Sequence, residues 1–181
     1  RTRPDLELRI VDALILGGDM TGKAVVPVIH QGGTKYRMVL LEQNFDAADE
    51  TELNDLIKRV RSRGYYPYLT NPDEIAELEK NPERVHEIFN VEVMRVFQQW
   101  VDLAEKKLDG TDMRVFVSPG NDDMFEVDDL IRASKRLTLA EGEVMALDDH
   151  HELISSGWSN VTPWRTHREE NEEQLKVRYE A

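Results

Sequence analysis

The apolar positions of the chain gather in short runs towards both ends, and these runs predict β-strands. Residues 11–16 are mostly apolar and are followed by Gly17 and Gly18, which is typical of a buried strand in a parallel sheet. Residues 25–29 and 36–41 are rich in β-branched and aromatic side chains and flank a Gly-Gly turn, which predicts a β-hairpin. Three later segments are also predicted to be strands: residues 113–118, 144–147 and 152–155.

Helix signals dominate the middle of the chain, over residues 49–110. Asn71 and Asn81 are each followed by a proline and an acidic residue, a pattern that caps a helix and suits its first turn. The helix predicted after Asn81 is long, because apolar residues recur every three or four positions as far as Leu103. Other helices are predicted over residues 52–62, 125–133 and 168–179.

This order of elements predicts an α/β fold built in three parts. Residues 1–48 and 111–181 would form the two parts of an α/β domain, and residues 49–110 would form a helical insertion between them. The length of 181 residues agrees with a single domain that carries an insertion.

The composition narrows the chemistry that the chain can perform. Its net charge of −13 disfavours a protein that coats nucleic acid or docks on anionic lipid. No apolar run is long enough to span a membrane and no secretory signal is visible, so the cytoplasm is the expected location. The chain has no cysteine and five histidines, so any metal ion would have to be bound by oxygen or imidazole ligands.

Two of the predicted strands end in similar polar turns. The first strand runs into Gly18 and Asp19, and the strand over residues 113–118 runs towards Gly120 and Asn121. Since ligands of α/β sheets bind beyond the carboxyl ends of the strands, Asp19 and Asn121 are candidate oxygen ligands for a hard divalent cation. Each motif alone is also typical of an ordinary turn, and that alternative stays open.

These motifs resemble those of the calcineurin-like metallophosphoesterase family, and most closely a prokaryotic branch of that family. The matching segments are Gly-Gly-Asp-Met-Thr-Gly-Lys over residues 17–23, Pro-Gly-Asn-Asp-Asp over residues 119–123, and a segment with two tryptophans over residues 155–164. The resemblance implies an αββα sandwich that binds two divalent ions of the Mn, Fe, Zn or Mg class. It also implies that the protein is a hydrolase in which an activated water cleaves a phosphate ester.

The resemblance assigns roles to three residues of the two turns. Asp19 would bridge the two metal ions, and Asn121 would bind the second ion through its amide oxygen. The family usually has a histidine after this asparagine, which acts on the leaving group. Asp122 stands at that position here, and it would have to carry a proton to take the same catalytic role.

Three further residues are candidate substrate contacts. Lys23 follows the first turn, and Trp158 and Asn160 lie in the matching segment near the C-terminus. The alternatives are a solvated lysine and an aromatic loop that covers the edge of a core. The expected partner is a small phosphoester. No membrane partner is expected, nucleic acid is disfavoured, and association with further copies of the chain stays open.

Two motifs of the family are absent from the chain. Its Asp-x-His motif should precede residue 11, its Gly-His-x-His motif should follow Trp164, and neither is present. Both absences fall at the ends, so we expect an incomplete sandwich that is part of a longer enzyme. The alternative is a degenerate member of the family that acts as a non-catalytic, protein-binding scaffold.

Two other sites are weaker alternatives. Residues 17–24 match a nucleotide-binding phosphate loop except that Ala24 replaces the serine or threonine that would hold magnesium. That loop also requires a following helix, whereas residues 25–29 favour a strand. The Asp-Asp-His-His sequence over residues 148–151 contains metal-ligand side chains, but its position after a weak strand favours an exposed polar turn.

Overall fold

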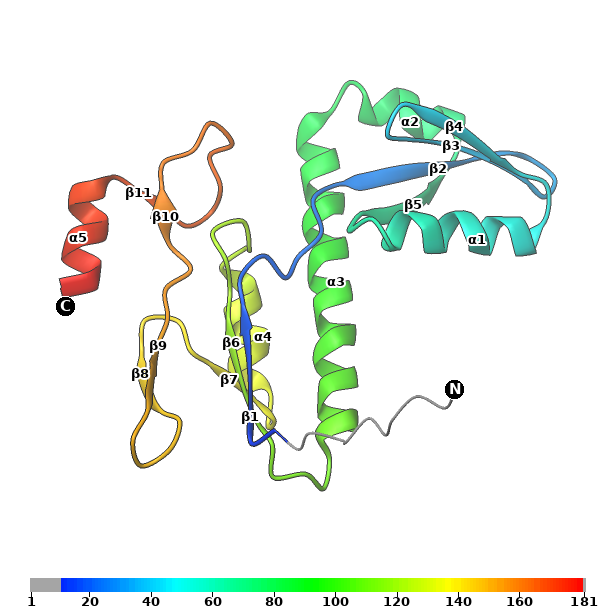
Figure 1. The fold of residues 1–181 in the computed structure, drawn as a ribbon. Helices are drawn as coiled ribbons and strands as arrows, with labels where there is room; N and C mark the ends of the chain where they lie inside the picture. Colours follow the sequence, from blue (N-terminus) through cyan, green and yellow to red (C-terminus); the bar gives the residue numbers. More distant parts are fainter. Residues whose placement is uncertain (1–10, 181) are drawn as a thin grey trace, which may run out of the picture. The chain divides into compact units, whose positions relative to one another are not determined.

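The computed structural model describes residues 11–180, which form a mixed α/β protein (Figure 1). These residues divide into two compact units. Residues 11–20 and 98–180 form the first unit, and Thr21–Phe97 forms the second. Among residues 11–180, no helix has both the length and the apolar character needed to cross a lipid bilayer.

The second unit is built on a four-stranded sheet with the order β4-β3-β2-β5. The predicted hairpin is confirmed, because β2 and β3 pair antiparallel around Gly32 and Gly33. Both glycines have positive φ angles, of 99° and 59°, which a side chain would disfavour. The bounds of the strands are β2 (Val25–Gly32), β3 (Lys35–Leu40), β4 (Gln43–Ala47) and β5 (Tyr66–Thr70).

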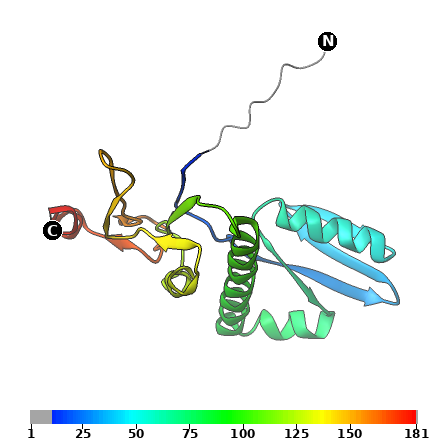
Figure 2. The same cartoon turned by 90° about the horizontal axis from the view of Figure 1, so that it is seen from below.

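Helices cover both faces of this sheet. Figure 2 shows α1 (Glu50–Arg61) and α2 (Pro72–Leu78) on opposite sides of it. Alternate residues of β2 and β3 face α1, and a core forms there from Val26, Val28, Met38, Leu40, Ala47, Leu56 and Val60. Asn71 and Asn81 cap α2 and α3 (Pro82–Leu108) as predicted, since their side chains accept hydrogen bonds from the amides three residues later.

The segment over residues 49–110 is mostly helical, as predicted, but it also contains β5. This strand pairs parallel with β2 from Val25 to Ile29. The sequence analysis missed β5 because it is short and contains Pro67, and because its partner strand lies far away along the chain. The pairing brings the hairpin and the helices α1 and α2 into one unit.

The first unit contains a three-stranded parallel sheet with the order β1-β6-β7. Helix α4 (Glu126–Ala133) connects β6 to β7 and buries Val127 and Ile131. The remaining elements lie towards the C-terminus, where β8 and β9 form an antiparallel hairpin and β10 and β11 pair parallel. The bounds are β1 (Ala13–Gly17), β6 (Arg114–Ser118), β7 (Leu137–Leu139), β8 (Val144–Ala146), β9 (Glu152–Ile154), β10 (Ser159–Asn160), β11 (Glu169–Glu170) and α5 (Glu172–Glu180).

Two expectations about this unit need correction. The first strand was predicted to be buried, but Leu14 and Ile15 are 40% and 47% exposed. The physical reason is that β1 lies at an edge of the described sheet and pairs only with β6 there. The last helix was predicted from residue 168, but it begins at Glu172 because residues 169 and 170 pair with β10. The αββα sandwich stays a prediction.

The alternation along β3 gives a direct test of which sheet face forms the core. Met38 is fully buried, whereas its neighbour Val39 is 56% exposed. We expect Met38→Ala to lower the free energy of unfolding by about 2–5 kcal/mol, because it removes buried methylene and sulfur contacts. Val39→Ala should cost at most about 1 kcal/mol. Urea denaturation followed by circular dichroism measures both, and equal losses would contradict the assigned faces.

Candidate functional site

The two polar turns that follow β1 and β6 lie side by side in the first unit. The strands are in parallel register, with Gly17 opposite Ser118. The amide of Gly18 then donates a 2.8 Å hydrogen bond to the carbonyl of Ser118, which extends the pairing by one residue. Asp19 and the segment that begins at Pro119 therefore leave the sheet at the same edge.

The absence of a side chain at Gly120 permits this close approach. A Cβ atom on Gly120 would lie less than 3.0 Å from the amide nitrogen and Oδ1 of Asp19 and from Cα of Gly18. The backbone of the first turn is also unusual, because Gly18 and Asp19 both have positive φ angles, of 78° and 48°. Aspartate tolerates this left-handed region better than most residues. The Asp19 carboxylate is exposed and lies directly against the residue that precedes Asn121.

A buried carboxylate joins the two turns. Asp123 is fully buried, and its Oδ2 accepts hydrogen bonds from the amide of Met20 at 3.0 Å and from the amide of Gly120 at 2.7 Å. The sequence analysis missed this role. The sequence gives no local signal for it, because the Met20 amide lies 103 positions away along the chain.

Asn121 is half-buried and is held by a segment about 45 residues further along the chain. Its side-chain amide donates from Nδ2 to Oγ1 of Thr166 at 2.9 Å, and its carbonyl accepts from the amide of Arg168 at 3.0 Å. The Arg168 guanidinium is itself buried, where it pairs with Asp128 at 2.6 Å and lies 4.6 Å from the centre of the Phe125 ring. The sequence analysis gave Thr166 no role and placed Arg168 at the start of a predicted helix.

Glu169 organises the loop that carries Thr166. Its carboxylate accepts hydrogen bonds from the backbone amides and from the hydroxyls of both Thr162 and Thr166, at 2.5–3.0 Å. These donors favour the ionised form and lower the pKa of Glu169 to about 2; the Thr162 hydroxyl has the largest effect and the Thr166 hydroxyl the next largest. Glu169 therefore stays charged throughout the physiological range.

The other predicted site residues are placed as follows. Asp122 is half-buried in the second turn, between Asn121 and the buried Asp123. Lys23 is exposed in the second unit, where its amide donates to the carbonyl of Gly64. The chain after Lys23 forms β2 rather than a helix, which contradicts the nucleotide-binding loop alternative.

Trp158 and Asn160 lie near the C-terminal elements. The Arg178 guanidinium sits 3.9 Å from the centre of a Trp158 ring, and Phe125 packs at 5.9 Å between ring centroids. The Tyr179 hydroxyl also donates to the Trp158 carbonyl. These contacts favour the interpretation of Trp158 as a packed aromatic. Asn160 is exposed in β10.

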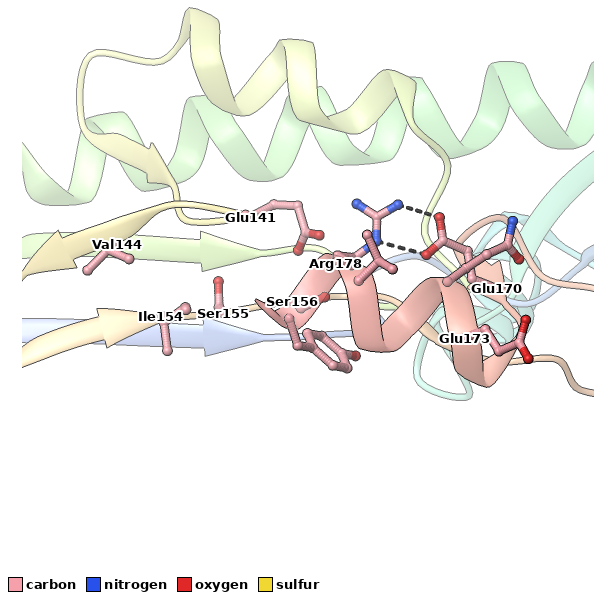
Figure 3. Close-up of a pocket in the computed structure, with 12 residues that line it drawn as sticks. Glu141, Val144, Ile154, Ser155, Ser156, Glu170, Glu173 and Arg178 are labelled. Carbon is pink, nitrogen blue, oxygen red and sulfur yellow. Dashed lines mark hydrogen bonds and ion pairs between the residues drawn. The ribbon is translucent and has the colours of Figure 1, made fainter. Parts of the chain in front are cut away.

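A groove of about 1200 Å³ lies in the same unit, between the β8–β9 hairpin and α5 (Figure 3). Its lining combines acidic and apolar side chains, and it includes an ion pair between Glu170 and Arg178. Glu141 of this lining also accepts a 2.6 Å hydrogen bond from the amide of Gly157. None of the described lining residues is a predicted site residue.

The two turns provide oxygen ligands of the types that hard cations prefer. The Asp19 carboxylate and the Asn121 amide oxygen are the ligand types that Mg²⁺ and Mn²⁺ prefer, and a missing Cβ at Gly120 brings their backbones together. They provide two protein donors. Within residues 11–180, no group of three or more His, Asp or Glu side chains is arranged to hold a metal ion.

The Asp148–His151 turn is satisfied by its own hydrogen bonds. Oδ1 of Asp148 accepts from the amides of His150 and His151, and the ring Nδ1 of His151 lies 2.8 Å from Oδ2. The His150 amide is the largest cause of the lowered pKa of Asp148, followed by the His151 side chain. This turn is exposed, which agrees with the interpretation of a polar turn.

Comparisons with protein-family models, with curated proteins and with solved structures find no match for this chain.

The close approach at Gly120 leads to a stability prediction. We expect Gly120→Ala to lower the free energy of unfolding by about 1–3 kcal/mol, because the new methyl group would overlap Asp19. Gly17→Ala is the matched control on the neighbouring strand, since a Cβ there meets nothing within 4 Å. Its effect should stay within about 0.5 kcal/mol. Equal losses in urea denaturation would contradict the packing of the two turns.

The low pKa of Glu169 predicts a pH-dependent contribution to stability. A group whose folded pKa is lowered from 4.5 to about 2 stabilises the fold above pH 4.5, and that contribution is lost as the pH falls towards 2. We expect Glu169→Gln to be less stable than wild type at pH 6.5, and most of this difference should be lost by pH 2.5. The exposed Glu172 provides the control substitution Glu172→Gln. A wild-type advantage of the same size at both pH values in urea denaturation would disprove the Glu169 assignment.

Proposed function

We propose that the chain carries one half of the active site of a metal-dependent phosphoesterase with a calcineurin-like sandwich fold. The observation that supports this proposal is the junction of the two turns, which brings Asp19 beside the Gly120–Asn121 segment. The two turns also share a buried carboxylate and a position where only glycine fits. A cation site explains why an exposed carboxylate and an amide side chain are held at one sheet edge.

The roles of the residues follow from their chemistry. Asp19 offers a charged oxygen and Asn121 a neutral one, so together they would hold divalent cations of the Mn, Fe, Zn or Mg class without neutralising them completely. When bound, two such cations lower the pKa of water and stabilise the charge that develops on the phosphoryl oxygens. Asp123 and Gly120 keep the two turns in register, so the donors are positioned before the substrate arrives.

Asp122 would act on the leaving group. It follows Asn121 directly and is half-buried, so it is partly accessible to a substrate. In this role the carboxyl would have to carry a proton that passes to the leaving oxygen as the ester bond breaks. The substrate is a small phosphate ester, for which Asn160 of the same unit remains an exposed candidate contact.

A second candidate function is that of a non-catalytic scaffold that binds another protein. The observation that favours it is the number of donors, since the two turns provide two protein ligands and residues 11–180 contain no cluster of three. Mg²⁺ takes six ligands and Zn²⁺ takes four or more, so a scaffold with two protein donors would bind either ion weakly. Metal binding therefore separates the two functions.

Hydrolysis of p-nitrophenyl phosphate and of bis(p-nitrophenyl) phosphate in the presence of Mn²⁺, by a protein that supplies the other half of the site together with this chain, tests the enzyme proposal. We expect Asp19→Asn and Asn121→Ala each to lower kcat/KM by at least about 100-fold, because each removes a direct oxygen ligand, which should cost more than the loss of an outer-shell partner. Asp109→Asn replaces an exposed carboxylate outside the two turns and should change kcat/KM less than about 2-fold.

Titration calorimetry with Mn²⁺ provides the second readout. We expect heat of binding from the wild-type chain and its loss in Asp19→Ala. Equal heats for the two proteins, together with equal rates for Asp19→Asn and Asp109→Asn, would exclude Asp19 from any metal site and favour the scaffold.

A further inference from the structure

A hydrogen-bonded chain of three side chains leads from Glu169 to Asn121. Oγ1 of Thr166 lies 2.6 Å from Oε1 of Glu169 and 2.9 Å from Nδ2 of Asn121. Thr166 is thus the link between a carboxylate that is fixed in its loop and the amide that is a candidate metal ligand. None of these contacts depends on a bound ion.

The number of available protons sets the direction of each hydrogen bond in this chain. An ionised carboxylate can only accept, so the single hydroxyl proton of Thr166 is donated to Glu169. The oxygen of Thr166 then has only lone pairs to offer to Asn121, and it can accept only from the NH₂ group. The orientation of the Asn121 amide is therefore fixed, with Nδ2 towards Thr166 and Oδ1 directed away from it.

The loop that supports this chain is itself firmly held. Glu169 accepts two hydrogen bonds from Thr162 and two from Thr166, and residues 169 and 170 pair with β10. The backbone is tied as well, because the Arg168 amide donates to the Asn121 carbonyl and the Arg168 side chain is buried against Asp128. The backbone and the side chain of Asn121 are thus held by the same four-residue segment.

We propose that Thr166 and Glu169 are positioning residues that orient the Asn121 amide so that its oxygen, and not its NH₂ group, faces the cation. This inference rests on the proposed function for the identity of the cation, but the orientation itself can be measured without it.

The physical reason for such a device is the near symmetry of an amide side chain. The oxygen and the NH₂ group of asparagine have almost the same shape, so packing alone barely distinguishes the two orientations. Their chemistry is opposite, because the oxygen attracts a cation and the NH₂ hydrogens repel it. A partner that can only accept a hydrogen bond favours the orientation in which the NH₂ group faces it and the oxygen points away. Outer-shell carboxylates orient histidine ligands in the same way.

Substitutions at Thr166, Thr162 and Glu169 provide a matched set of variants for the test. Thr166 and Thr162 both donate a hydroxyl to Oε1 of Glu169, but only Thr166 bonds to Asn121. Thr166→Val removes the link and keeps the shape, Thr166→Ser keeps the hydroxyl, and Thr162→Val is the control that removes the other hydroxyl. Glu169→Gln provides a second route, since a neutral amide no longer forces the Thr166 proton to one side.

Two measurements on the full 181-residue chain decide the matter. Calorimetry gives the affinity for Mn²⁺, and NMR gives the hydrogen-exchange rate of the Asn121 side-chain NH₂ group in the absence of metal, with the exposed Asn160 as an internal reference. The Asn121 signals are assigned through their loss in Asn121→Asp. We expect Thr166→Val to weaken Mn²⁺ binding about 10-fold or more and to speed this exchange to the rate of Asn160. Thr166→Ser and Thr162→Val should stay within about 3-fold of wild type in both measurements.

The outcomes separate the inference from the function on which it rests. Equal Mn²⁺ affinities for wild type and Thr166→Val would overturn the positioning role and leave the proposed function standing. If wild type binds no Mn²⁺, the proposed function fails, and the NMR measurement then decides the orientation alone. In that case, an Asn121 exchange rate equal to that of Asn160 in the wild-type protein would overturn it. If Thr166→Val does not fold, Glu169→Gln replaces it, and we expect the same weakening of Mn²⁺ binding and the same faster exchange of the Asn121 NH₂ group.

Discussion

The carboxylate of Asp123 is the contact on which the geometry of the candidate site depends. Its Oδ2 accepts hydrogen bonds from the amides of Met20 and Gly120, so it connects the two turns. Met20 lies 103 positions before Asp123 along the chain. A buried carboxylate without donors would be costly, and buried amides without acceptors would be costly too. Separating the two turns would break the hydrogen bond between the carboxylate and the Met20 amide, so this hydrogen bond holds the turns in one arrangement.

The site as a whole is assembled from polar contacts and small residues rather than from a large apolar core. Gly120 and Gly157 allow backbones to approach where a Cβ would overlap Asp19 or the carbonyl oxygen of Pro119. The apolar core of this unit lies behind the turns, on β6 and α4, where Val115, Val117 and Val127 are buried. This division is common in α/β proteins, since the sheet provides rigidity and the loops at its carboxyl edge provide the chemistry.

The features that could be predicted from the sequence are those with local causes. Asn71 and Asn81 cap their helices through bonds to residues three positions away, and the Gly-Gly turn sets the hairpin through its own backbone angles. The polar turns that carry Asp19 and Asn121 after two strands were also predicted, and the structure brings the two turns together. Their roles in binding a metal ion stay predictions.

The features that the sequence analysis missed have distant partners. Strand β5 is stabilised by pairing with β2, and Asp123 by the Met20 amide. The hydrogen bonds that link Glu169 to Asn121 through Thr166 join residues 48 positions apart. The sequence around Thr166 does not indicate that it bonds to Asn121. The exposure of Leu14 and Ile15 follows from the edge position of β1, which an apolar run cannot reveal. Such contacts depend on which segments meet in space, and a single sequence with local patterns does not contain that information.

The central claim is that the Asp19 turn and the Asn121 turn form one cation site. Paramagnetic broadening of backbone amide signals by substoichiometric Mn²⁺ tests it directly, because the broadening falls off steeply with distance from the ion. We expect the strongest broadening at Gly18, Asp19 and Met20 and, at the same Mn²⁺ concentration, at Gly120, Asn121 and Asp122. Broadening centred on the Asp148–His151 turn, or on only one of the two turns, would contradict the claim.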